Sequence, residues 1–140
     1  MALRVYKYGE KVLREVSRPV SVVDDSLRSL ANEMIELMHK SRGVGLAAQQ
    51  VGRLERMCVI DIPEGCEEPE DELFNAPIRM PLQLFNPEII SREGSIREKE
   101  GCLSFPGLGG KVDYAQFLHD ASEIQYKVGV RHDAVGDIAA

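Results

Sequence analysis

Two short segments hold the residues best suited to chemistry. The first is GVGLAAQQVG at residues 43–52, where glycines flank Val44 and two glutamines follow. Glycine lets the backbone approach another group closely, and a glutamine amide can hold a polarised oxygen through its N–H donors. Taken alone, the pattern is more typical of a helix end followed by a buried turn. A phosphate-binding loop is a poor match, because its final glycine and its lysine are misplaced or missing.

The second segment is EGCLSFPG at residues 100–107. Cys102 stands there between a glycine and a leucine, with Glu100 two residues before it. The residues alone leave three interpretations of this cysteine open. It packs as an apolar side chain, it acts as a nucleophile beside a histidine close in space, or it binds a metal together with further ligands.

A helical pattern over residues 25–42 leads into the first segment. Apolar residues recur at i, i+3, i+4, i+7, i+8 and i+11 and so share one face. They are Leu27, Leu30, Ala31, Met34, Ile35 and Met38. Asp24, Asp25 or Ser26 can cap the start, and we expect Gly43 to end the helix in a left-handed turn.

Strand patterns lie on both sides of a loop in the middle of the chain. Residues 56–62, RMCVIDI, are apolar and rich in β-branched side chains, which predicts a strand with Cys58 in the core. Residues 63–81 are acidic and contain proline, which predicts an exposed loop with at most one helical turn. Cys66 lies in this loop and has no assigned role.

The remaining patterns also favour strands. Residues 82–90 look extended, with Pro87 at an edge or bulge because proline cannot donate to a ladder. Polar residues 91–99 suggest a hairpin partner. The alternation in EIQYKV at residues 123–128 predicts a half-buried strand. One good helix, several strands and long loops indicate an α+β fold.

Length and composition limit the possible classes. The chain has 140 residues, enough for one domain that can bury a core, and we predict a single domain over residues 1–140. Its net charge of −6 argues against a general nucleic-acid binder. No apolar run approaches the roughly 20 residues that span a bilayer. Three cysteines without an export signal favour reduced thiols in the cytoplasm.

Taken together, the two segments resemble the first two signature motifs of the peptide deformylase family. GVGLAAQQ and EGCLS occur in the family's order, and VLREVSRPV at residues 12–20 and FNPEI at residues 85–89 are also similar to it. The resemblance implies antiparallel strands around a core helix. It also implies a metal-dependent hydrolase that removes the formyl group from formyl-methionyl peptides of nascent proteins, close to the ribosome.

The resemblance implies a role for each matching residue. Cys102 corresponds to a ligand of divalent iron or zinc, which a soft thiolate favours over magnesium or calcium. Gln50 corresponds to the glutamine whose amide contacts the formyl oxygen. The backbone N–H of Leu103 corresponds to the second donor to that oxygen.

The resemblance also implies residues that bind the substrate or support the site. Val44, Gly45 and Gly101 match positions that bind the substrate. Gly43 and Glu100 match positions of structural support.

The family's third motif, H-E-x-D-H, does not occur in this sequence. That motif sets two histidine ligands at i and i+4 beside a catalytic glutamate. The only histidines here are His39, His119 and His132, and none of them has this spacing. Residues 123–140 resemble the strands that lead into the motif's helix. We therefore expect that the metal-binding helix is missing, that the chain is C-terminally truncated, and that it is inactive as written.

Two alternatives stay open beside an inactive deformylase homologue. In one, the chain is an active hydrolase that takes its ligands from His119 and His132 or from a partner chain. In the other, it is a non-catalytic module that binds the N-termini of nascent chains. His39, near the end of the predicted helix, is expected to complement the helix dipole instead.

Overall fold

The computed structural model describes residues 2–64, 76, 78–114, 117–120 and 125–127. Among these residues there is one α-helix, α1 (Asp25–Lys40), which confirms the predicted helix. Asp24 caps the start, because its Oδ1 accepts from the Leu27 N–H at 2.9 Å. All six residues of the predicted apolar stripe are buried.

The end of α1 differs from the expectation for Gly43. Arg42 takes the left-handed conformation, with φ of 58°, and Gly43 does not. A glycine is needed at position 43 for a different reason. A Cβ there would lie 2.7 Å from Cδ1 of Leu103, so the absent side chain makes room for the second segment.

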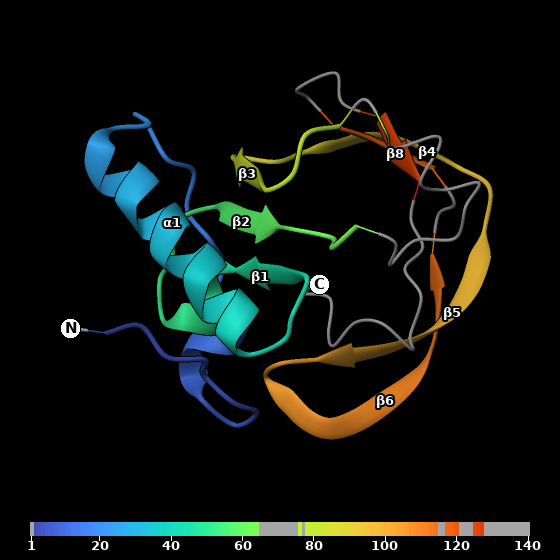
Figure 1. The fold of residues 1–140 in the computed structure, drawn as a ribbon, viewed down its shortest axis with the longest axis horizontal. Helices are drawn as coiled ribbons and strands as arrows, with labels where there is room; N and C mark the ends of the chain where they lie inside the picture. The colour runs from blue at the N-terminus through green and yellow to red at the C-terminus, as the bar shows by residue number, and fades with distance from the viewer. Residues whose placement is uncertain (1, 65–75, 77, 115–116, 121–124, 128–140) are drawn as a thin grey trace.

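Helix α1 packs on a small antiparallel sheet, as Figure 1 shows. The sheet has the order β1 (Gly45–Ala47), β2 (Met57–Ile60), β3 (Leu82–Phe85). β2 confirms the predicted strand with slightly shorter bounds, and Met57 and Val59 point into the core. Cys58, predicted to be a core residue, is only half-buried on the opposite side of the strand.

The remaining strands form a second sheet and a hairpin. The sheet has the order β4 (Ile89–Glu93), β7 (Phe117–Asp120), β8 (Gln125–Lys127), and the hairpin joins β5 (Ile96–Cys102) to β6 (Phe105–Tyr114). Every strand pair is antiparallel. The resulting α+β architecture is the predicted class.

Several finer expectations need correction or lie outside the described residues. The extended stretch 82–90 is two strands, because Asn86 takes a φ of 51° after β3 and Pro87 follows it. Residues 96–99 do lie in a hairpin, since β5 pairs with β6, whereas residues 91–93 belong to β4, which pairs with β7. Strand β8 confirms a strand within 123–128. Most of the 63–81 loop, Cys66 and residues 128–140 lie outside the described residues.

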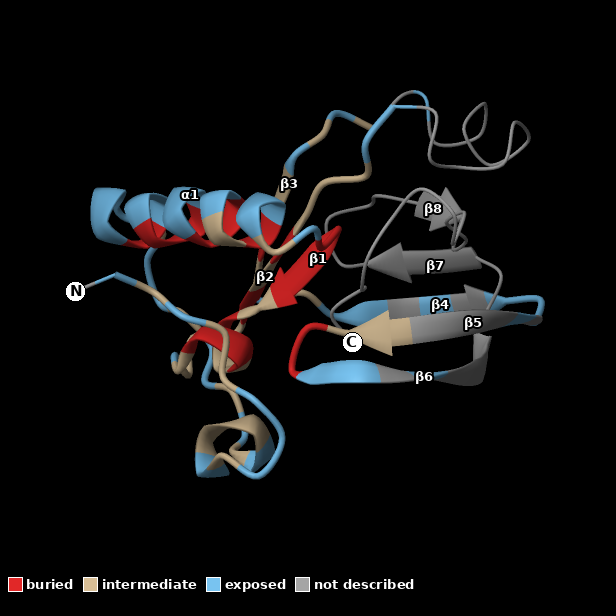
Figure 2. Cartoon of the chain, turned by 60° about the horizontal axis from the view of Figure 1, so that its bottom comes forward, coloured by how far each residue is buried: buried red, intermediate tan, exposed pale blue. Residues whose placement is uncertain are grey.

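The hydrophobic core lies between α1, β1, β2 and the short 3-10 helix η2 (Ala48–Val51). Figure 2 shows its buried segments there, and it also shows a buried turn between β5 and β6. That turn contributes Leu103 to the core cluster. Within the part of the chain that the structure describes, no helix has both the length and the apolar character needed to span a bilayer.

Candidate active site

The two sequence segments meet where η2 faces the end of β5. The side-chain nitrogen of Gln50, Nε2, lies 3.5 Å from Cys102 Sγ and 3.3 Å from Ser104 Oγ. Gln50 and Ser104 are buried, and Cys102 is half-buried. Residues about fifty positions apart in the sequence are thus brought within hydrogen-bond distance.

The orientation of the Gln50 amide is fixed by its other end. The Ala47 N–H donates to Gln50 Oε1 at 3.0 Å, which is one half of a capping box at the start of η2. Because the oxygen end accepts this bond, the NH₂ end must face the thiol and the hydroxyl. The site therefore presents amide donors beside Cys102.

The geometry of strand β5 places the Cys102 side chain. The pairing of β5 with β6 shifts register between Gly101 and Cys102, and bulges of this kind re-aim side chains. Immediately after Cys102, the Leu103 side chain enters the core against Gly43. A residue of the second segment is thus packed under the first, which holds the two segments together.

The N-terminal segment adds three hydrogen bonds that sequence reasoning missed. The Tyr6 N–H donates to the Gln50 carbonyl at 2.7 Å, and the Tyr8 N–H donates to the Ser104 carbonyl at 2.8 Å. Between them, Lys7 Nζ donates to the Leu103 carbonyl at 2.7 Å. No periodicity or motif signals Lys7. The related sequence feature is Gly52. Its φ of 79° favours glycine, and its missing Cβ leaves room for the Tyr6 ring.

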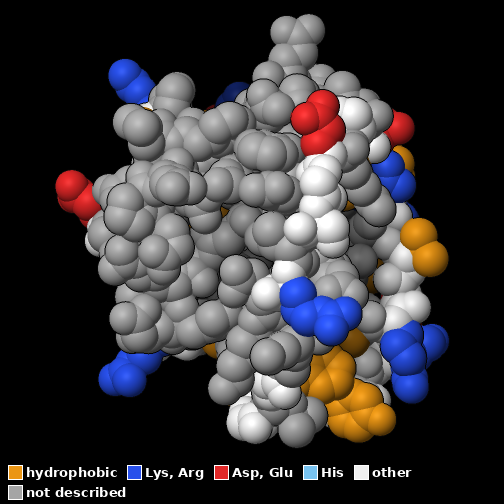
Figure 3. Space-filling model, turned by 90° about the vertical axis from the view of Figure 1, so that its right-hand side faces the viewer, with side chains coloured by type: hydrophobic (Ala, Val, Ile, Leu, Met, Phe, Trp, Pro, Cys, Tyr) orange, Lys and Arg blue, Asp and Glu red, His pale blue; other side chains and the backbone are white. Residues whose placement is uncertain are grey.

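A cavity of about 310 Å³ opens beside the facing residues. Gln50, Cys102 and Ser104 line it together with Tyr8 and Phe105, whose ring centroids are 5.2 Å apart. Its size falls in the range of small-ligand sites. Hydrophobic side chains also gather at the lower edge of the face in Figure 3.

The carboxylate of Glu10 also lines this cavity. Its pKa is lowered to about 2 by the hydrogen bonds from the Arg4 guanidinium and then by the bond from the Lys7 N–H. Glu10 therefore stays ionised at neutral pH, and its charge is matched by Arg4.

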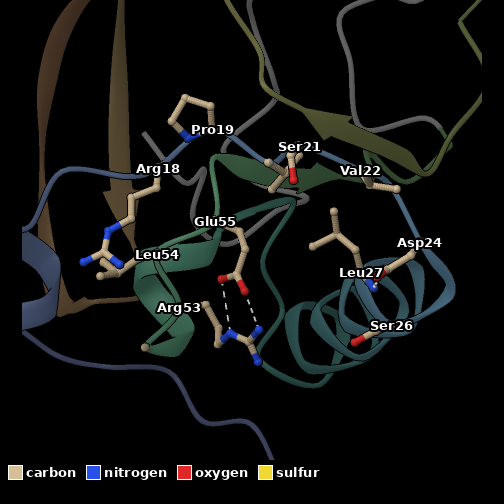
Figure 4. A pocket seen from close by; sticks show the side chains of 12 residues that line it. Arg18, Pro19, Ser21, Val22, Asp24, Ser26, Leu27, Arg53, Leu54 and Glu55 are labelled. Carbon is tan, nitrogen blue, oxygen red and sulfur yellow. Dashed lines mark hydrogen bonds and ion pairs between the residues drawn. The ribbon is translucent and has the colours of Figure 1, made fainter.

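A second cavity, of about 490 Å³, lies between the start of α1 and the loop before β2 (Figure 4). Arg53 and Glu55 lie side by side there and are hydrogen-bonded to each other. This pairing lowers the pKa of Glu55 and raises that of Arg53. None of the predicted site residues lines this cavity, so we place the site at the smaller one.

Other predicted residues lie further from the cavity. Val44 and Gly45 are buried and do not line it, and Gly101 is half-buried in β5. The backbone of Glu100 pairs with Gly110 across the hairpin. The predicted roles of these four residues remain predictions.

The structure describes two of the three histidines, and both belong to other elements than Cys102. His39 Nε2 lies 2.7 Å from Asp61 Oδ2 near the end of α1. His119 lies in β7, opposite Ser91 in the β4–β7–β8 sheet, whereas Cys102 belongs to the β5–β6 hairpin. His132 lies outside the described residues.

The donor set does not by itself fit a catalytic metal. Zinc or iron of that kind takes about three protein ligands and keeps one open position. Among the residues that the structure describes, no group of three or more His, Cys, Asp or Glu side chains is arranged to hold a metal ion. Cys102 is one thiol beside an amide donor and a hydroxyl, so a catalytic metal there would need further ligands.

Comparison with known proteins identifies the family. A family model described as "Polypeptide deformylase" matches residues 2–117, and the chain belongs to the peptide deformylase family. It is 43% identical to a peptide deformylase of Endomicrobium trichonymphae over 79% of its own length and 59% of that protein. The corresponding enzyme of Alkalilimnicola ehrlichii is 43% identical, over 81% and 58%. The chain thus spans less than two-thirds of these relatives' lengths.

Solved structures agree with the family assignment. The crystal structure of the peptide deformylase from Thermotoga maritima matches with a TM-score of 0.70 and 29% identity, over 91% of this chain and 80% of that one. The Ehrlichia chaffeensis enzyme matches with a TM-score of 0.72 and 29% identity, over 99% and 76%. The predicted α+β deformylase fold is confirmed.

Proposed function

We propose that this chain binds the formylated N-terminus of nascent peptides, the substrate of the deformylase reaction. The observation that supports the proposal is the fixed orientation of Gln50, whose amide donors face Cys102 at the edge of the 310 Å³ cavity. A formyl group is a small amide with an exposed carbonyl oxygen. Two donors that converge on one oxygen are the usual means of holding such a group.

In the deformylase reaction, which needs ligands beyond Cys102, water would add to the formyl carbon and charge would build up on its oxygen. The Gln50 amide and the Leu103 N–H are the proposed donors to this oxygen. Each preorganised donor of this kind typically lowers the barrier by about 3 kcal/mol. Cys102 would hold Fe²⁺ or Zn²⁺ if two further ligands were supplied, and formate and a free amino terminus would then be the products.

We propose further that the 140-residue polypeptide alone binds without turnover. Its sequence has no histidine pair at i and i+4 and no glutamate beside such a pair, so two ligands and the proton-transfer group are not supplied. Ligands from His119 and His132 or from a partner chain are the competing proposal. The proposed substrate occurs in the cytoplasm near the ribosome.

Peptide binding tests the proposal directly. Formyl-Met-Ala-Ser and unformylated Met-Ala-Ser are titrated into the chain, and binding is followed by isothermal calorimetry. We expect the formylated peptide to bind at least tenfold more tightly, because the free amine offers no carbonyl oxygen to the donors. Equal affinities would contradict the proposal.

A matched pair of variants assigns the effect to Gln50. Gln50→Leu should remove the preference for the formylated peptide. Gln83→Leu should retain it, because Gln83 lies in β3 and donates to Asn32 Oδ1 at 2.8 Å, away from the cavity. In parallel, formate release is measured with added Fe²⁺ or Zn²⁺. Release of formate would disprove binding without turnover and favour the competing ligands, which His119→Ala and His132→Ala would then test.

A further inference from the structure

The contacts of residues 6–8 point to a function for the N-terminal segment at the site. We call these three residues the N-terminal clamp. Tyr6 bonds to the carbonyl of Gln50, in the first segment, and Lys7 and Tyr8 bond to the carbonyls of Leu103 and Ser104, in the second. Three consecutive residues thus connect both halves of the candidate site.

Lys7 differs from its neighbours because it bonds through its side chain. The bonds from Tyr6 and Tyr8 use backbone N–H groups, which every residue except proline provides. The bond from Lys7 to the Leu103 carbonyl needs an ammonium group at the end of a long side chain. Hydrogen bonds from charged donors are also roughly twice as strong as neutral ones.

The carbonyl that Lys7 contacts belongs to the turn that follows Cys102. Residues 102–104 join β5 to β6, and the register shift at Cys102 separates them from the regular ladder. The Leu103 side chain packs into the core from one side. The Lys7 ammonium holds the backbone of the same residue, so both the side chain and the main chain of Leu103 are fixed.

We propose that Lys7 is a positioning residue of the candidate site. Its ammonium group fixes the 102–104 turn in the register in which the Gln50 amide faces Cys102 and Ser104. The positive charge also lies in the turn whose Leu103 N–H is the proposed donor to the substrate oxygen. This second consequence rests on the proposed function, whereas the first is a property of the folded chain.

The test uses Lys7→Met, which keeps an apolar stem and removes the charge and the donors. Lys7→Arg is the rescue variant, since a guanidinium restores both. Lys11→Met is the matched control, because Lys11 Nζ lies 3.6 Å from Glu15 Oε1 and the lysine side chain is 87% exposed. Two-dimensional ¹H–¹⁵N spectra report the Gln50 side-chain NH₂ and the backbone amides of residues 102–104.

We expect Lys7→Met to shift the Gln50 side-chain signals and the turn amides while the amides of α1 stay in place. Lys7→Arg should restore the wild-type positions, and Lys11→Met should leave them unchanged. Unchanged Gln50 and turn signals in Lys7→Met, or equal shifts in Lys11→Met, would overturn the proposal. A general loss of fold would instead move the α1 signals as well and would also count against a positioning role.

Titration with formyl-Met-Ala-Ser adds the functional readout. Lys7→Met should weaken binding roughly tenfold or more, as expected for a lost hydrogen bond from a charged group, and Lys7→Arg should recover most of it. If the wild-type chain binds no formylated peptide, the proposed function fails. The spectra would still decide whether Lys7 positions the turn.

Discussion

The candidate site joins two regions that are held in different ways. The first, which we call the packed unit, consists of α1, β1–β3 and η2, and its core includes six buried residues of α1 alone. The second is the β5–β6 hairpin. Among the hairpin's described side chains, the buried ones are Leu103 and Ser104, both in the turn.

This contrast shows where the site geometry is vulnerable. Gln50 is positioned by η2, which packs into the core, and the Ala47 N–H fixes the orientation of its side chain. Cys102 depends on a short turn that is fixed by the Leu103 side chain and by the N-terminal clamp. Changes in the packed unit should therefore act on global stability, and changes at the turn should act on the site.

Leu103→Ala should produce the largest effect, because Leu103 belongs to both regions. It is only 8% exposed and lies in the core cluster. Its truncation should lower the free energy of unfolding by about 2–5 kcal/mol, and it should also displace Cys102 from Gln50. Urea unfolding and the Gln50 side-chain NH₂ signal measure the two consequences.

Two variants separate these consequences. Leu103→Met preserves volume and should cost less than about 1.5 kcal/mol. Met34→Ala removes a core side chain of α1 and should destabilise by a similar 2–5 kcal/mol while the Gln50 signal of the folded protein stays in place. If Met34→Ala moved that signal as far as Leu103→Ala does, the two regions would not differ as described.

Gly43→Ala should have the next largest effect. The added Cβ would lie 2.7 Å from Leu103 Cδ1 and 3.4 Å from Met38 Cγ, so the leucine must move. Overpacking of this kind costs about 1–3 kcal/mol. The double variant Gly43→Ala, Leu103→Ala should be less destabilised than the sum of the single ones, because the alanine would fill part of the space left by the leucine. Strict additivity in urea unfolding would show that the two residues do not share this space.

The packed unit was largely predictable from the sequence, because its signals are local. The spacing of Leu27 to Met38 predicted α1 and its buried face, and Asp24 was one of three predicted caps. The apolar pattern of residues 56–62 predicted β2. Even so, Gly43 was misinterpreted as the left-handed helix end, because its actual requirement is close contact with Leu103, sixty positions later.

The contacts between the hairpin and the rest of the site were less predictable, because they join residues far apart in the sequence. The match to the family's two motifs assigned Gln50 and Cys102 to one site without any knowledge of the geometry. Residues 91–99 were predicted to include a hairpin partner, but nothing local indicated that Lys7 reaches Leu103, 96 residues away. Ser104 was not predicted to be a site residue either, although its burial beside Gln50 makes it part of the site.

Asp24→Ala tests the contrast between the packed unit and the hairpin, because it is a moderate change at the start of α1. The loss of the hydrogen bond from the Leu27 N–H should cost about 1 kcal/mol. Asp24→Asn keeps an acceptor and should cost less. Because the change acts on α1 alone, the Gln50 and turn signals should stay in place in the folded protein. A shift at residues 102–104 would show that the helix start is coupled to the hairpin.

The smallest effect concerns Glu10, which lies beside the clamp and accepts from the Lys7 N–H at 2.7 Å. Its pKa in the folded chain is about 2, below the ordinary 4.5, first because of Arg4 and then because of the Lys7 N–H. A lowered carboxyl pKa adds stability that is fully present above about pH 4.5 and is lost as the pH falls toward 2. The gain is small, because the pair with Arg4 is exposed to solvent.

Glu10→Gln should therefore reduce the dependence of the unfolding free energy on pH between 4.5 and 2, measured by urea unfolding at several pH values. Arg4→Met should reduce it in the same way, and the double variant should add little, because one interaction is removed in each case. The Gln50 signal should not change, because the backbone bonds of Tyr6 and Tyr8 and the Lys7 side-chain bond remain. A pH dependence as steep as that of the wild type in both variants would show that Glu10 is not linked to folding, and the clamp would then hold the site without this carboxylate.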